Sequence, residues 1–114
     1  MPELWTIPLW FLLVHWFADF VLQTDWQAEN KSKNNVALTR HVSTYSLCWL
    51  PLGISFAAVT FVTHWLTDWV TSRINSRLYK AGKIHEFFVS VGFDQVIHYV
   101  TLALTYYWLV NQRG

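Results

Sequence analysis

Charged side chains are scarce in this sequence. Asp, Glu, Lys and Arg make up 13% of the 114 residues, about half of their share in an ordinary soluble domain. The net charge is only +1, which argues against a general nucleic-acid-binding protein, because that function needs a basic surface to neutralise phosphates. The single cysteine, Cys48, cannot form an internal disulfide, and it lies in an apolar stretch where we expect it to pack as a small hydrophobic residue.

Hydrophobic residues dominate instead, at 54% of the chain, with 18% aromatic residues. The apolar segments are interrupted by histidine, aspartate, threonine and tryptophan, so the polar residues are not confined to the connections. Ionisable groups inside membrane segments are rare and usually functional. We therefore expect the lipid bilayer to be the main environment of this protein, and its function to lie where the apolar segments are interrupted.

The N-terminal segment is apolar enough to be mistaken for a signal peptide. It lacks a basic leading region, it carries Glu3, and it contains His15 and Asp19 within the apolar run. It also has no small-residue cleavage site. We interpret it as a retained first helix.

Four apolar segments predict one all-α domain over residues 1–114, a polytopic membrane protein built as a four-transmembrane-helix bundle. The expected spans are about 5–23, 37–52, 54–74 and 86–110. The second and third come from one long apolar region, which we divide at Pro51 and Gly53 because proline removes a backbone donor and glycine permits a reversal. A single kinked helix over this region is the alternative.

The charges of the connections favour four spans over three. Residues 25–35 and residues 73–83 are both polar and contain Lys or Arg, and cytoplasmic connections are enriched in Lys and Arg. Both connections lie in the cytoplasm only if an even number of crossings separates them. We therefore expect both termini outside, in the inner membrane of a bacterium.

Three of the expected spans carry an ionisable pair at a spacing of four residues. The pairs are His15 with Asp19, His64 with Asp68, and Asp94 with His98. Residues at i and i+4 project from one face of a helix, so each pair can face the bundle interior. The remaining span, the second, adds His41.

These seven side chains are expected at one depth. At about 1.5 Å of rise per residue, nearly all of them fall roughly 6 to 18 Å from the cytoplasmic edge of their spans. A charged group that stands alone in lipid is costly, so we expect the seven to converge and to pair or bind an ion. Any single pair is equally well explained as a structural hydrogen bond, and it is the coincidence of all seven that favours a site.

Imidazole nitrogens and carboxylate oxygens together suit a divalent metal ion, zinc first, with manganese, magnesium or iron as alternatives. The candidate ligands are His15, Asp19, His64, Asp68, Asp94 and His98, of which some carboxylates can instead orient a ligating histidine. The candidate catalytic residues are His41, as a general base or further ligand, and Asp94. The candidate substrate-binding residues are Gln23, Lys31, Arg40, Ser72 and Arg73. For Gln23, Ser72 and Gln95, helix packing is favoured over a ligand role.

The pattern His15-x-x-x-Asp19-Phe-x-x-Gln23-Thr-Asp25, followed by His41, His64-x-x-x-Asp68 and Asp94-Gln95-x-x-His98, resembles a family of small bacterial and phage membrane proteins, domain of unknown function 3307. The resemblance covers nearly the whole chain and implies no particular activity. Residues 63–68 are also similar, more weakly, to a helix of membrane-bound proteins described as metal-dependent hydrolases. The H-R-G-x-T-H-S motif of those proteins is absent here, so this likeness supports a metal more than a reaction.

The leading hypothesis is a membrane-embedded, metal-dependent hydrolase that acts from the cytoplasmic side on a phosphate-containing or lipid-linked substrate. One alternative is a proton or metal-ion transport or relay protein. Another is a non-catalytic phage or bacterial membrane effector in which the polar cluster only stabilises the bundle. A homo-oligomer is compatible with so small a bundle, although no small-xxx-small motif specifies one.

Overall fold

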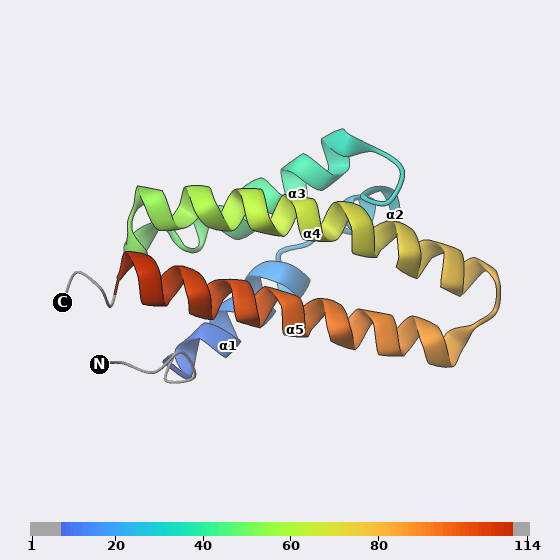
Figure 1. The fold of residues 1–114 in the computed structure, drawn as a ribbon. Coiled ribbons are helices and arrows are strands. Elements are labelled where there is room, and N and C mark those ends of the chain that lie inside the picture. Colours follow the sequence, from blue (N-terminus) through green and yellow to red (C-terminus); the bar gives the residue numbers. More distant parts are fainter. Residues whose placement is uncertain (1–7, 111–114) are drawn as a thin grey trace.

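Helices make up the described part of the chain, which covers residues 8–110 of a computed structural model (Figure 1). In chain order they are α1 (Trp10–Trp16), the π-helix η1 (Phe17–Val21), α2 (Asp25–Asn30), α3 (Asn35–Leu47), the 3-10 helix η2 (Leu50–Leu52), α4 (Ile54–Lys80) and α5 (Ile84–Leu109). Within these residues there is no strand, which confirms the expected all-α class. Residues 5–7 of the first expected span lie outside the described range.

The long helices α4 and α5 form an antiparallel hairpin (Figure 1). α4 ends in a Schellman motif, in which the amide of Lys83 donates to the carbonyl of Leu78 at 3.0 Å and the amide of Gly82 donates to that of Tyr79 at 3.1 Å. The third span was expected to end at residue 74, but the helix continues to Lys80, so most of the basic stretch 73–83 is helical. Polar residues do not stop a helix, whereas Gly82, with a φ of 75°, supplies the left-handed residue that does.

A tight turn separates α3 from α4 at the predicted reversal. Pro51 lies in η2, and Gly53 has a φ of 116°, a conformation that glycine adopts at little steric cost. The amide of Gly53 donates to the carbonyl of Leu50 at 2.8 Å. Two helices, and not one kinked helix, therefore cover this apolar region.

The first two expected spans form shorter helices than the apolar pattern suggests. α1 and η1 contain seven and five residues, and α3 contains 13. Thirteen residues of α-helix rise about 20 Å, less than the hydrocarbon thickness of about 30 Å. Among residues 8–110, α5 is the one helix that is both long and apolar enough to cross a bilayer.

An aromatic cluster closes the bundle at the end near η2. Phe11, Trp49 and Phe56 are almost completely buried, and the ring of Phe11 meets that of Trp49 edge to face at a centroid distance of 4.9 Å. Tyr45 lies on α3, four residues before Trp49, and its ring centroid is 4.0 Å from that of His64. The polar cluster therefore lies beside the aromatic cluster, on the side toward α2.

Candidate metal centre

Asp19 is positioned by an irregular helix. In η1 the amide of Leu22 donates to the carbonyl of Phe17, five residues earlier, at 2.9 Å. This π-helical pattern widens the turn and is frequent at functional sites. Asp19 lies in the middle of η1, is only 4% exposed, and directs its carboxylate toward His41 of α3.

Histidines from α3 and α4 meet two carboxylates at the centre of the cluster. Nε2 of His41 lies 2.9 Å from Oδ1 of Asp19 and 3.4 Å from Oδ2 of Asp68. Nε2 of His64 lies 3.0 Å from the same oxygen of Asp68 and 3.5 Å from that of Asp19. All four side chains are buried, so solvent does not screen these contacts.

α5 adds a third histidine and a third carboxylate. Nε2 of His98 lies 3.1 Å from Oδ1 of Asp68 and 3.3 Å from Oδ1 of Asp94. The rings of His64 and His98 are stacked, with centroids 4.0 Å apart and planes inclined by 10°. Three helices and η1 thus bring together residues that are distant in the sequence.

Two sets of ligand atoms in this cluster are close enough to share a metal ion. In each set the atoms lie within 4.8 Å of one another, and every side chain is buried. The first set is Asp19, His41, His64 and Asp68, and the second is Asp19, Asp94 and His98. These buried Asp/His groups are therefore positioned to hold a metal ion, and nitrogen and oxygen ligands of this kind are common in protein metal sites.

The hydrogen bonding of the first set suits a cation. Neither ring nitrogen of His64 has a hydrogen-bond partner, and Oδ2 of Asp68 has none either, although it lies 3.0 Å from Nε2 of that histidine. The two atoms are close but poorly aligned, as expected when both point at a shared third position. Because unsatisfied polar atoms are costly to bury, this arrangement favours a bound ligand.

The stacked histidines limit how far protons alone can neutralise the three carboxylates. If the rings of His64 and His98 were both protonated, two positive charges would face each other at a centroid distance of 4.0 Å. A divalent cation supplies the same charge without this repulsion. The composition and the geometry of the cluster are thus both suited to holding a metal ion.

His15 lies beside the two ligand sets and not within them. Its Nδ1 lies 2.7 Å from the hydroxyl of Tyr45, and its Nε2 lies 2.7 Å from Oε1 of Gln95. Because an amide oxygen only accepts hydrogen bonds, Nε2 must donate, and a nitrogen that carries a proton cannot ligate a metal. His15, an expected ligand, thus belongs to neither ligand set in this structure and contacts Gln95 instead.

Gln95 in turn holds Asp94, together with Thr71. Nε2 of Gln95 donates to Oδ2 of Asp94 at 3.1 Å, and the hydroxyl of Thr71 donates to Oδ1 at 2.7 Å. Since a carboxylate accepts, these bonds fix the orientation of the Gln95 amide and leave its oxygen for His15. The sequence pattern favours helix packing over a ligand role for Gln95 and does not single out Thr71.

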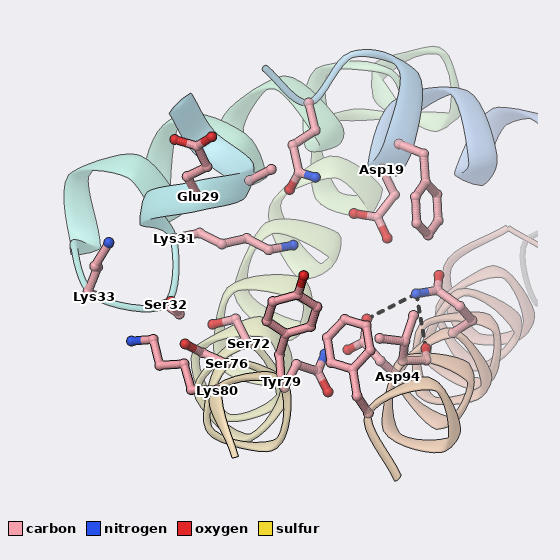
Figure 2. A pocket seen from close by; sticks show the side chains of 17 residues that line it. Asp19, Glu29, Lys31, Ser32, Lys33, Ser72, Ser76, Tyr79, Lys80 and Asp94 are labelled. Carbon is pink, nitrogen blue, oxygen red and sulfur yellow. Dashed lines mark hydrogen bonds between the residues drawn. The ribbon is translucent and has the colours of Figure 1, made fainter. Parts of the chain in front are cut away.

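A cavity of about 610 Å³ lies next to the metal centre (Figure 2). Asp19 and Asp94, which belong to the ligand sets, are buried residues of its lining. Lys31 extends into the cavity from the turn after α2, while Lys33 and Lys80 lie on the side away from Asp94 (Figure 2). Neutral polar side chains complete the lining, namely Gln23, Ser32, Ser72, Asn75, Ser76, Tyr79 and Gln95.

Three of the five predicted substrate-binding residues line this cavity; these are Gln23, Lys31 and Ser72. The other two, Arg40 and Arg73, are not part of the lining. The guanidinium of Arg40 lies over the ring of Trp26 at 5.4 Å, and that of Arg73 lies over the ring of Trp69 at 4.1 Å. Both arginines therefore make cation-π contacts at the surface instead of facing the cavity.

Lys33 and Lys80 line the cavity although they are outside the predicted set. In the sequence Lys80 indicates only topology, whereas Lys33 belongs to a basic cluster that mainly indicates topology and also places cations at the cytoplasmic mouth of the site, where phosphates can be attracted. Lys80 joins the cavity because α4 runs beyond its expected end, and the Gly82 stop signal is the feature that indicates this.

Comparison with known proteins identifies the family. A family model described as "Protein of unknown function (DUF3307)" matches residues 7–113, so the chain belongs to this family. No curated protein matches the chain, and no solved structure matches it.

Proposed function

We propose that this member of the DUF3307 family is an integral membrane protein that uses a divalent cation to hydrolyse a phosphate-containing substrate from the cytoplasmic side. One observation carries the proposal: Asp19 and Asp94 belong to the buried metal-ligand sets and also line a cavity into which Lys31 extends. Phosphoryl transfer depends on a cation and on positive groups that stabilise the developing negative charge, and this cavity offers places for both.

The distribution of polar and apolar residues supports a membrane location. Among residues 8–110, 12 polar or charged residues are buried against 10 hydrophobic ones. Large apolar side chains on three different helices are more than half exposed, for example Leu13, Leu66, Phe88 and Trp108. Apolar surface on this scale is a liability in water, whereas a bilayer favours an apolar exterior around a polar interior.

The positions of the basic residues support the orientation. Lys31 and Lys33 follow α2, Lys80 ends α4 and Lys83 precedes α5, at the end of the bundle opposite η2 (Figure 1). We assign this end to the cytoplasm and the membrane to the bacterial inner membrane. In a four-span arrangement, α3 and η2 together run from residue 35 to residue 52, and local thinning of the bilayer accommodates the shorter crossings.

Each residue of the centre has a role in this proposal. The cation is held by His41 and His64 together with Asp19 and Asp68. A ligand role suits His41 better than the role of a general base, because His41 does not line the cavity. A divalent cation bound there supplies Lewis acidity to the phosphate group and to the attacking water. Asp94, at the cavity, is placed to accept a proton from that water.

Lys31 has a matching role on the substrate side. Its ammonium lies 3.7 Å from Oδ2 of Asp68, and its side chain is 21% exposed, so it reaches from the cavity to the ligand set. A lysine at this position stabilises negative charge on a phosphate that is bound next to the cation.

Zinc is our first choice of cation because imidazole and carboxylate ligands suit it, with manganese, magnesium and iron as the alternatives.

A phosphatase assay on the detergent-purified chain tests this proposal. Phosphate release from a chromogenic phosphate ester and from a lipid phosphate should depend on added Zn²⁺ or Mn²⁺. Asp68→Asn should abolish this activity because it removes a ligand from the first set, whereas Asp25→Asn, at an exposed position on α2, should retain it. Wild-type protein that releases no phosphate with any of the four cations would overturn the proposal.

Ion or proton transport receives less support. Transport requires polar groups across the whole bilayer, but toward η2 the described residues bury only the hydroxyls of Ser46, Thr60 and Thr105 together with the aromatic cluster. The ionisable path ends near Tyr45. A site that is open at one end fits a hydrolase better.

A further inference from the structure

The lysines of the cavity lie at two levels of burial. Lys31 is partly buried and reaches the metal centre, whereas Lys33 and Lys80 are exposed and lie on the other side of the cavity (Figure 2). We infer that Lys33 and Lys80 form a second anion subsite, so that the ligand carries a diphosphate group attached to an apolar chain. The inference that the inner phosphate binds next to the metal centre rests on the proposed function. The inference of an outer subsite at Lys33 and Lys80 does not depend on it.

Local structure holds both outer lysines in place. The amides of Lys33 and Asn34 donate to the carbonyl of Asn30 at 3.0 and 2.8 Å, and the side chain of Asn34 caps α3, so the turn that bears Lys33 is fixed at both ends. Lys80 is the last residue of α4, and the Schellman motif fixes the backbone that follows it. Both lysines therefore line the cavity from an ordered stretch of backbone.

The charge of the cavity away from the metal centre is positive. Lys31, Lys33 and Lys80 line it, and Glu29 is the only acidic residue of the lining besides Asp19 and Asp94. Hydroxyl donors accompany the lysines at the outer level, on Ser32, Ser76 and Tyr79. One phosphate next to the metal centre would leave these outer cations and donors unused, whereas a second phosphate engages them through charge-assisted hydrogen bonds.

Buried polar atoms between the two levels also lack partners. The hydroxyl of Ser72, in a side chain that is 6% exposed, has no hydrogen-bond partner, and neither has Oδ1 of Asn75 or Oε1 of Gln23. All three residues line the cavity. A ligand bound in the cavity can supply partners for these three groups.

The size and walls of the cavity indicate more than an inorganic anion. Its volume of about 610 Å³ lies within the usual range for pockets that bind small organic molecules, roughly 300 to 1,000 Å³. Phe20 of η1 and Phe87 and Val91 of α5 supply apolar lining. These side chains suit an apolar chain attached to the diphosphate.

Binding measurements on the cation-free, detergent-solubilised chain test the subsite without relying on hydrolysis. Inorganic pyrophosphate should bind about tenfold more tightly than inorganic phosphate, because it engages the outer lysines as well. The double variant Lys33→Met/Lys80→Met should lose this preference while its affinity for phosphate is unchanged. Lys83→Met, which removes a lysine that does not line the cavity, should behave as wild type, and Lys33→Arg/Lys80→Arg should keep the preference.

The apolar chain is tested in the same experiment with dodecyl diphosphate, which should bind more tightly than inorganic pyrophosphate. Equal affinities for the two diphosphates would overturn the apolar part of the inference. Equal affinities for phosphate and pyrophosphate in the wild type, or an unchanged preference in the double methionine variant, would overturn the second subsite. A failure of the proposed function can be distinguished from a failure of the second subsite. If only the proposed function is wrong, the chain binds no divalent cation but still prefers pyrophosphate to phosphate.

Discussion

The ammonium of Lys31 lies 3.7 Å from Oδ2 of Asp68, a carboxylate that belongs to the first metal-ligand set. Lys31 follows α2, a helix that takes no part in the polar cluster, and still reaches a side chain that is 1% exposed. In the cation-free protein this lysine supplies positive charge to the carboxylate. A metal ion held by this ligand set would therefore compete with Lys31 for Asp68.

This competition predicts the effect of Lys31→Met. The variant should bind Zn²⁺ about three- to tenfold more tightly than the wild type, because a positive charge near the ligands is removed. Isothermal titration with a competing chelator measures the affinity. Lys33→Met is the matched control and should leave the affinity unchanged, and weaker Zn²⁺ binding by Lys31→Met would show that the lysine does not compete with the ion.

A second prediction separates His15 from His64. His15 contacts Tyr45 and Gln95 through hydrogen bonds, whereas both ring nitrogens of His64 lack hydrogen-bond partners. His15→Gln should therefore retain the metal ion with affinity reduced about tenfold, as for other residues that support ligands. His64→Gln should lose the ion. Equal metal contents in the two purified variants would refute this division of roles.

A third prediction concerns the hydroxyl that holds Asp94. Thr71→Val preserves the shape of the side chain but removes the 2.7 Å hydrogen bond to Oδ1 of Asp94. We expect the free energy of unfolding to fall by about 1 kcal/mol and the metal-dependent rate to fall with it. Thr63→Val is the control, because the hydroxyl of Thr63 donates only to carbonyls of its own helix. If both variants behave alike, the Thr71 bond does not support the site.

A fourth prediction follows from the proposed orientation. In a Cys48→Ser background, cysteine introduced at Lys83 should react with a membrane-impermeant thiol reagent only after the cells are opened. Cysteine introduced at Leu50 should react in intact spheroplasts, because η2 lies at the opposite end of the bundle (Figure 1). Labelling of both positions from the same side would contradict the topology.

Much of the fold follows from local signals in the sequence. Pro51 and Gly53 mark the turn between α3 and α4, and a spacing of four residues puts His64 and Asp68 on one face of α4. The convergence of the polar side chains is predictable from the cost of leaving each of them alone in an apolar environment. The end of α4 is also encoded, by Gly82.

The rest depends on partners that spacing does not reveal. His15 and His64 have the same relation to an aspartate four residues later, and only the contacts of His15 with Tyr45 and Gln95 distinguish them. The π-helical turn around Asp19 has no local signal that we recognise. Arg73 stacks on Trp69, four residues earlier, at a spacing that is favourable in a helix. The sequence reveals this pair only once α4 is known to continue beyond residue 74.

Metal analysis of the purified protein tests the central claim most directly, with Asp19 as the residue to change because it belongs to both ligand sets. Elemental mass spectrometry after dialysis should find at least one divalent ion per wild-type chain, an equal amount in Asp25→Asn, and none in Asp19→Asn. If the wild type holds no more divalent metal than Asp19→Asn, the buried Asp/His cluster is not a metal centre.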